Sequence, residues 1–463
     1  MNNIAELAQS TRSSRLVEFL LSLEIEKLPS AVIHEARIRL LDSLGCGLYG
    51  AKTPWGKIAA EVVYEERSHG RATVYGNREP IAPARAALVN GTATHGFEVD
   101  DAVPGGVHAG AVVVPAALAM AEQYELSGTR LLVGLIAGYE AASRTGVALG
   151  VVGWGFHKTG IAGVVGAAVA SGVTLGMSHE QLMRAIGIAC SNAAGIKSFI
   201  QGSGGMIKRM HAGRAAESGV LACLLARRGF TAPLAALDGK FGLLEAYAGN
   251  NSEPEVLDSK LGDSYVINSA ETKAYPCCYG LHTMVQALQN LRIEHGIEHA
   301  NVRSVRVGTN KRSVATHAEI APRETMAAQY SMPFTAAVAL ASDPQDPRSF
   351  TGAALDDRTV SALARRVELY ADPEMEAFYP ARNCARVEVR LTDDRTLEAK
   401  VLDAKGTPAN PCSEDEIREK FRRFASVSNT DDSLAEILSL VQRIETLPSV
   451  APLSKALRMG LRA

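Results

Sequence analysis

The stretch TGIAGVVGAAVASGVTLGMS, residues 159–178, contains 20 residues without one charged side chain. Gly, Ala, Val, Ser and Thr dominate it, and it has few of the Leu, Ile and Phe side chains that favour membrane insertion. Glycine lowers helix stability relative to alanine, so its recurrence at 163, 166 and 172 indicates that neighbouring backbones approach closely. The stretch therefore predicts a helix buried in a soluble helical core, rather than a membrane span.

Helical patterns continue on both sides of this stretch. Apolar residues between Ile33 and Leu44 recur at the spacing of a half-buried helix, and further helices are predicted at 116–124 and 131–145. The tetrapeptide that starts at Ser178 has the form of a capping box, in which Ser178 and Gln181 satisfy exposed backbone amides. The first 250 residues therefore indicate a helical bundle.

The pattern changes near residue 270. Short β-branched or alternating segments predict strands, the last two joined as a hairpin, at 302–307, 387–391 and 397–401. Helices are expected between these strands at 329–340 and 357–366. This mixture is typical of a small α+β domain.

Helical patterning returns at Ser413, where a second capping box opens a helix whose mixed charges are typical of a solvated face. The sequence therefore predicts a mainly α protein with a large all-helical domain in two parts. We expect that domain at residues 1–268 and 404–463, with a smaller α+β lid domain, residues 269–403, inserted before the C-terminal helices.

Composition narrows the class of protein. The chain has 463 residues, of which 47% are apolar, so it can bury a sizeable core. A net charge of −2 argues against a nucleic-acid binder and against a polybasic membrane-surface protein. Seven Cys without a C-x-x-C pair, behind an N-terminus that lacks a signal-peptide pattern, favour reduced thiols in the cytoplasm.

Signatures of bound cofactors are absent from the sequence. Residues 202–207, GSGGMI, begin like a dinucleotide loop but lack its third glycine and a preceding strand. The chain has no Walker phosphate loop and no His-Glu-x-x-His zinc helix. Cys278 and His282 have metal-ligand spacing, but no second ligand pair lies near them in the sequence. We therefore expect neither an organic cofactor nor a metal.

Ionisable residues collect first in the segment from His95 to His108. The adjacent carboxylates Asp100 and Asp101 lie between two histidines and lead into an apolar helix, so they can supply an acid/base pair and orient a histidine. An alternative is a solvated loop in which Asp101 caps a local backbone group.

A second segment, Trp154–Gly160, places His157 at the start of the uncharged helix. The helix dipole disfavours a cationic imidazole there, which leaves a neutral base or a hydrogen-bond partner. A merely structural capping histidine is the alternative.

A third segment, 204–214, concentrates the cationic or titratable side chains Lys208, Arg209, His211 and Arg214. Lys208, His211 and Arg214 are expected on one helix face, where such a cluster suits a small polycarboxylate: Arg binds carboxylates and a desolvated Lys can act as a base. An exposed basic face is the alternative.

A fourth segment, Lys273–His282, contains Cys277 and Cys278 beside His282. Vicinal thiols next to a histidine are compatible with a thiolate nucleophile. Two small buried thiols at a domain junction are the favoured interpretation.

These segments, in this order, resemble the MmgE/PrpD family of polycarboxylate dehydratases, decarboxylases and epimerases. The resemblance covers nearly the whole chain and rests on five stretches: 90–108, 157–160, 208–216, 275–278 and 323–334. It implies a large helical domain, a smaller α+β lid domain, a homodimer and no cofactor. It also implies a site in the cleft between the domains, with Asp100, Asp101, His108, His157 and Lys208 as catalytic residues. Residues predicted to bind substrate are Arg209, His211, Arg214, Cys278, His282 and Gln329.

The chain also departs from the family pattern. Glu98 and Ala102 stand where the dehydratases and decarboxylases have Asp and Thr, and Cys278 and Phe334 stand where the decarboxylase has His and Tyr. His108 is followed by Ala109 rather than Pro. These departures argue against decarboxylation.

We therefore expect a cofactor-independent lyase that abstracts an α-proton from a small polycarboxylic hydroxy-acid and eliminates water. Either His157 or Lys208 would be the base, and His108 would protonate the leaving hydroxyl. Two alternatives stay open: an epimerase or racemase of a carboxylated amino or imino acid that uses the same site, and a non-catalytic polycarboxylate-binding protein.

Overall fold

The structure, a computed structural model, describes residues 11–150, 155–201 and 205–461. Its contacts divide the chain into two compact units. We call them the helical unit, with residues up to Gly96, Asp100–Ala270 and the residues from Ser413 onward, and the α+β unit, with Phe97–Val99 and Glu271–Cys412. The class is therefore mainly α with a smaller α+β region, as predicted.

The unit boundaries differ in detail from the predicted domain boundaries of 268/269 and 403/404. The C-terminal boundary lies later because residues 404–412 are held in the α+β unit, where the Thr272 amide donates to the Gly406 carbonyl at 2.9 Å. The assignment of residues 97–99 to the α+β unit was not predicted, since nothing in their local pattern separates them from their neighbours.

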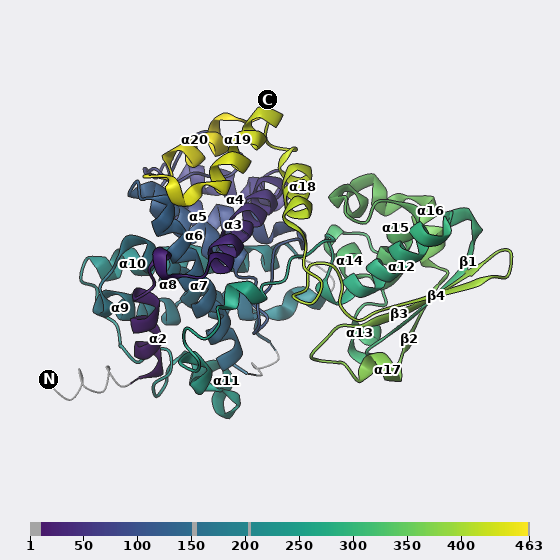
Figure 1. The fold of residues 1–463 in the computed structure, drawn as a ribbon, viewed down its shortest axis with the longest axis horizontal. Coiled ribbons are helices and arrows are strands. Elements are labelled where there is room, and N and C mark those ends of the chain that lie inside the picture. Colours follow the sequence, from purple (N-terminus) through teal and green to yellow (C-terminus); the bar gives the residue numbers. More distant parts are fainter. Residues whose placement is uncertain (1–10, 151–154, 202–204, 462–463) are drawn as a thin grey trace. The chain divides into compact units, whose positions relative to one another are not determined.

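The helical unit contains ten helices before residue 270 and three after residue 412 among the residues that the structure describes (Figure 1). The first group is α2 (Arg12–Leu21), α3 (Ser30–Gly50), α4 (Pro54–Glu65), α5 (Pro83–Thr94), α6 (Gly110–Gln123), α7 (Gly128–Ala148), α8 (Lys158–Leu175), α9 (His179–Ser191), α10 (Met206–Arg227) and α11 (Leu243–Ala248). The second group is α18 (Glu414–Ala425), α19 (Asp431–Gln442) and α20 (Ala451–Met459).

Helix α8 lies in the core of this unit, packed against α6, α7 and α10. It is the one helix of the described residues that is long and apolar enough to cross a membrane, and 89% of its apolar window is buried inside the protein. Its glycines permit the close packing: a Cβ on Gly166 would lie 2.6 Å from the Cβ of Ala142 on α7. The prediction of a buried helix in a helical core is confirmed.

Both predicted capping boxes are present. The Ser178 hydroxyl accepts from the Gln181 amide at the start of α9, and Ser413 does the same for Glu416 at the start of α18. The Ile33–Leu44 pattern lies inside α3, which begins at Ser30 directly after Pro29.

The α+β unit contains a four-stranded sheet with the strand order β2-β1-β3-β4 (Figure 1). Strand β1 pairs parallel with β2 and antiparallel with β3, and β3 and β4 form the predicted hairpin. The strands are β1 (Val302–Thr309), β2 (Val367–Ala371), β3 (Ala385–Leu391) and β4 (Thr396–Val401). The helices are α12 (His282–His295), α13 (Lys311–Thr316), α14 (Thr325–Tyr330), α15 (Met332–Ala341), α16 (Arg358–Ala364) and α17 (Pro373–Glu376).

Two features of this unit differ from the sequence prediction. The single helix expected at 329–340 is divided into α14 and α15 at Ser331, whose extended backbone ends one helix while its hydroxyl accepts from the Phe334 amide to begin the next. Strand β2 was not predicted, because its stability comes from parallel pairing with β1 rather than from a local alternating pattern.

Candidate active site

The segment between α5 and α6 carries ionisable side chains that are buried. His95 is 0% exposed, Asp100 1% and Asp101 3%, whereas Pro104 and Gly106 are exposed. The alternative of a solvated loop is therefore wrong for His95, Asp100 and Asp101. The same alternative also predicted that Asp101 caps a local backbone group, and this part is correct. One carboxylate oxygen of Asp101 accepts from the Gly110 amide at 2.8 Å, at the start of α6.

Asp100 is the acceptor for two histidines. Its Oδ2 lies 2.6 Å from Nδ1 of His95 and 3.4 Å from Nδ1 of His108. Burial favours the protonated acid, but the charges and hydrogen bonds of these two histidines outweigh it and hold the pKa of Asp100 well below its usual value. Burial in turn lowers the pKa of His95 to about 4, against the opposing effect of Asp100. At neutral pH the pair therefore consists of a carboxylate and a neutral imidazole.

Asp101 acts on the site through its backbone. Its carbonyl oxygen lies 2.9 Å from Nδ1 of His108, so the His108 N–H donates to it and the ring orientation is fixed. Its carboxylate instead accepts from the Tyr139 hydroxyl at 2.5 Å and from the Gly110 amide. Burial raises the pKa of Asp101. These contacts make Asp101 a positioning residue for His108, and its predicted catalytic role stays a prediction.

His157 directly precedes α8, and its backbone amide donates to the Gly195 carbonyl at 2.9 Å. Its ring Nδ1 lies 3.1 Å from Nδ1 of His211, on α10. Burial, followed by the charges of His95 and Lys208, lowers the pKa of His157 well below its usual value. The imidazole is thus neutral, as predicted. The largest cause of its lowered pKa is burial, whereas the sequence analysis attributed the neutral form to the helix dipole.

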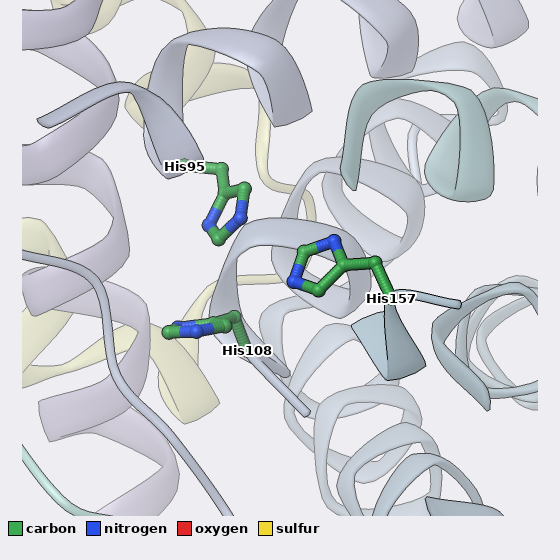
Figure 2. A group of neighbouring side chains, drawn as sticks. All are labelled: His95, His108 and His157. Atoms are coloured by element: carbon green, nitrogen blue, oxygen red, sulfur yellow. The ribbon is translucent and has the colours of Figure 1, made fainter. Parts of the chain in front are cut away.

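The rings of His95, His108 and His157 point toward one another (Figure 2). The centroids of His95 and His108 are 4.6 Å apart, and those of His95 and His157 are 5.7 Å apart. One nitrogen from each ring lies within 4.8 Å of the others, so these three side chains can hold a small group between them. His95 opened the first predicted segment but was not singled out as a site residue.

Lys208 and His211 both lie on the buried side of α10, at 3% and 7% exposure. Burial lowers the pKa of His95, His157 and His211, and the charge of Lys208 adds to this effect, so the cation acts on all three histidines. Arg214 departs from the predicted common face: its side chain is 54% exposed and forms an ion pair with Glu217. The alternative prediction of an exposed basic face is thus wrong for Lys208 and His211, which are buried, and correct for Arg214, which is exposed.

Arg209 is 1% exposed and is held by contacts inside the helical unit. It donates to the carbonyl of Gly96 at 3.1 Å and to that of Gly205 at 2.6 Å, and its guanidinium lies over the Trp55 ring at 4.8 Å. These contacts fix the backbone next to His95. The predicted contact of Arg209 with a substrate carboxylate stays a prediction.

The remaining predicted residues belong to the α+β unit. The Gln329 side chain donates to the carbonyls of Phe97 at 2.7 Å and Pro276 at 3.0 Å, and the Cys278 amide donates to the Gln329 carbonyl. His282 is buried, and its Nε2 lies 3.3 Å from the Cys277 carbonyl oxygen. Burial raises the pKa of the Cys277 thiol, which agrees with the interpretation of a buried structural cysteine. Cys278 is only partly buried, so the prediction of two buried thiols is wrong for Cys278.

One buried ion pair of the α+β unit was not predicted. Lys273 Nζ lies 3.0 Å from a carboxylate oxygen of Glu98, and the two side chains are 1% and 2% exposed. Glu98 also has a left-handed backbone, with φ of 57°. The predictions about Trp154 and about Gly202–Gly204 fall outside the described residues.

Comparison with known proteins identifies relatives along almost the whole chain. A family model for the MmgE/PrpD N-terminal domain matches residues 14–255, and one for the MmgE/PrpD C-terminal domain matches residues 275–445. The chain is 29% identical to the cis-aconitate decarboxylase-like protein oryM of Aspergillus oryzae, over 95% of this chain and 96% of that protein. It is 27% identical to the cis-aconitate decarboxylase of Aspergillus terreus, over 98% of each chain. It is 26% identical to the human cis-aconitate decarboxylase, over 94% of this chain and 92% of the human one.

Proposed function

Because this chain belongs to the MmgE/PrpD family, we propose that it is a cofactor-independent lyase that removes an α-proton from a small polycarboxylic hydroxy-acid and eliminates water. The observation that carries the proposal is the cluster of His95, His108 and His157, in which His95 and His157 are buried and His108 is half-buried, together with the Asp100 carboxylate and the charge of Lys208. Buried groups with such shifted pKa values are typical of acid/base sites.

Substrate binding would begin with Lys208. Lys208 is 3% exposed and its positive charge acts on the histidines of the cluster, so it would attract a substrate carboxylate. The Lys208 cation beside a substrate carboxylate would also stabilise the negative charge that develops on that carboxylate when the α-proton leaves.

His157 is the proposed base. It is neutral in the free protein, and the carboxylates of a bound polyanion would raise its pKa and favour proton uptake. Its Nδ1 contact with His211 at 3.1 Å fixes the tautomer, because one ring donates and the other accepts. His211 is thereby a positioning residue for the base.

His108 is the proposed acid. Its Nδ1 donates to the Asp101 carbonyl and lies 3.4 Å from an Asp100 carboxylate oxygen, so its Nε2 can face a leaving group. In the proposed step the Cα–H bond breaks toward His157 and a carbon–carbon double bond forms. The carbon–oxygen bond breaks, and the hydroxyl departs as water with the His108 proton.

Decarboxylation is the second candidate, because the relatives named above are cis-aconitate decarboxylases or similar to them. In that reaction a carbon–carbon bond would break, carbon dioxide would leave, and a site acid would protonate the remaining carbanion. Cys278 and Phe334, which replace the decarboxylase His and Tyr, argue for dehydration instead.

A proton-NMR screen in heavy water with citrate-like, aspartate-like and unsaturated tricarboxylic acids separates the candidates. We expect deuterium exchange with loss of water. Loss of carbon dioxide would support the decarboxylase, and exchange without loss of either would support an epimerase. Binding with no exchange would support a non-catalytic polycarboxylate-binding protein.

Variants link the activity to this site. Lys208→Ala and His157→Ala should each lower turnover by about 10²-fold or more, whereas Arg214→Ala, which changes an exposed cation on the same helix, should retain it. Wild-type turnover in both of the first two variants would contradict the assignment.

We also propose that the protein is cytoplasmic and forms a homodimer. Static light scattering would measure the mass of the particle, and a mass near 49.1 kDa would contradict the dimer.

A further inference from the structure

One ring nitrogen of the histidine cluster lacks a partner. His95 is 0% exposed, and its Nε2 has no hydrogen-bond partner among the described residues. A buried polar atom without a hydrogen bond destabilises the protein, so its presence in the centre of a site calls for a ligand.

The chemistry of that nitrogen follows from the other side of the ring. Nδ1 of His95 lies 2.6 Å from the Asp100 carboxylate, which can only accept, so Nδ1 carries the hydrogen. With the pKa of His95 lowered to about 4, the ring is neutral and Nε2 has a free lone pair. The missing ligand atom must therefore donate a hydrogen, as a hydroxyl does and a carboxylate does not.

The cluster has room for one small group. One ring nitrogen each of His95, His108 and His157 lies within 4.8 Å of the others. Two nitrogens that contact one oxygen at hydrogen-bond distances of about 2.8 Å lie about 4.6–4.8 Å apart, so an oxygen atom fits this limit. A tetrahedral zinc ion, whose nitrogen ligands lie about 3.3 Å apart, is the competing occupant.

We infer that the nitrogen atoms of His95 and His108 contact the hydroxyl of the substrate, with His95 Nε2 accepting its hydrogen, while His157 takes the α-proton. The inference rests on the proposed function and adds a specificity-determining residue to it. In the elimination, the hydroxyl keeps the hydrogen that it donates to His95, gains one from His108 and leaves as water. An acid without a hydroxyl would leave His95 unsatisfied and would bind more weakly.

Citrate and tricarballylate test this directly, because they differ only in the hydroxyl. Calorimetry on the wild-type protein should give at least about 10-fold tighter binding of citrate. In His95→Phe, which keeps a planar ring without the nitrogens, the two acids should bind within about 3-fold of each other. His317→Phe, a histidine of the α+β unit whose Nδ1 contacts the Tyr330 carbonyl, is the matched control and should keep the preference.

Equal binding of the two acids to the wild-type protein would overturn the inference and leave the proposed function standing. If neither acid binds, the same pair of measurements uses the acid found in the heavy-water screen and its deoxy analogue. Failure of every acid in that screen would contradict the proposed function, and this inference with it.

Nitrogen NMR of the wild-type protein with ¹⁵N-labelled histidine keeps the test independent of how His95→Phe folds. Citrate should shift the unprotonated Nε2 signal of His95, and tricarballylate should not. Titration with Co²⁺ examines the competing ligand: a tetrahedral cobalt spectrum that disappears in His95→Phe would show a metal site and would overturn the hydroxyl assignment.

Discussion

Glu98 and Asp100 are separated by one residue, yet different units hold them. Asp100 belongs to the helical unit and accepts from two histidines, whose protonation can change during a reaction. Glu98 belongs to the α+β unit and pairs with Lys273 at 3.0 Å. This difference is the basis for our proposal that Asp100 serves proton transfer and that Glu98 stabilises the fold of the α+β unit.

The strongest test of this contrast replaces each carboxylate by its amide. Asp100→Asn should lower kcat by about 10²–10⁴-fold, because an amide can favour the wrong tautomer of His95 without changing its shape. Glu98→Gln should have a much smaller effect on kcat. Turnover of the acid identified by the heavy-water screen measures both, with circular dichroism to show that each variant is folded. Equal losses in the two variants would remove the distinction.

Lys273→Met should have the largest effect on stability. It leaves the Glu98 carboxylate buried without its cation, which typically costs about 3–5 kcal/mol. Urea unfolding measures the loss, and separate transitions for the two units would have to be fitted separately. The double variant Glu98→Gln/Lys273→Met should recover most of the loss. If the single variant is as stable as the wild type, Glu98 does not depend on this pair.

The His95–Asp100 pair should make stability depend on pH. The folded pKa of His95, about 4, lies below its unfolded value of about 6.5, so the unfolded state binds the proton more readily. The contribution is fully present above about pH 6.5 and falls as the pH decreases toward 4, by at most about 1.4 kcal/mol per pH unit.

Urea unfolding at several pH values, in buffer with a chelator, measures this slope. His95→Phe should flatten it, whereas Glu98→Gln, which changes the carboxylate paired with Lys273 in the α+β unit, should keep it. An unchanged slope in His95→Phe would assign the pH dependence to other buried histidines.

The smallest effect is expected at Tyr139, which contacts Asp101 rather than Asp100 or Glu98. Tyr139→Phe removes a 2.5 Å hydrogen bond to a buried carboxylate and should cost about 1.5–3 kcal/mol of stability. Activity should fall only modestly, because the Asp101 carbonyl still orients His108. A thermal melt and one kcat measurement are sufficient. A loss of activity as large as in Asp100→Asn would make Asp101 a catalytic residue.

Local patterns predicted much of the fold. The uncharged stretch within α8 and the capping boxes at Ser178 and Ser413 are determined by neighbouring residues, so the sequence reveals them. Strand β2 depends on pairing with β1, in which Val367 lies opposite Val305. The two residues are more than 60 positions apart in the sequence, so local patterns do not reveal the strand.

The site divides in the same way. The structure brings together the predicted residues Asp100, His108, His157 and Lys208, whose residue types mark them as chemically active. The role of His95 depends on which of its nitrogens lacks a partner, which only the packed structure reveals.

The ion pair of Glu98 and Lys273 joins residues 175 positions apart, so no spacing rule predicts it. At Arg209 the residue type predicted a contact with a substrate carboxylate. In the structure its guanidinium donates to the backbone carbonyls of Gly96 and Gly205.

The placement of residues 97–99 bears on protein engineering. Suppose that residues 271–412 alone are replaced by those of a relative. The positions of Lys273 and Gln329 would then come from the relative, while their partners in residues 97–99 would come from this chain. The α+β unit is therefore not a cassette that can be moved as one continuous insert. A working chimaera should carry the tripeptide Phe97–Val99 together with residues 271–412, and recombination points are best placed at the edges of both segments.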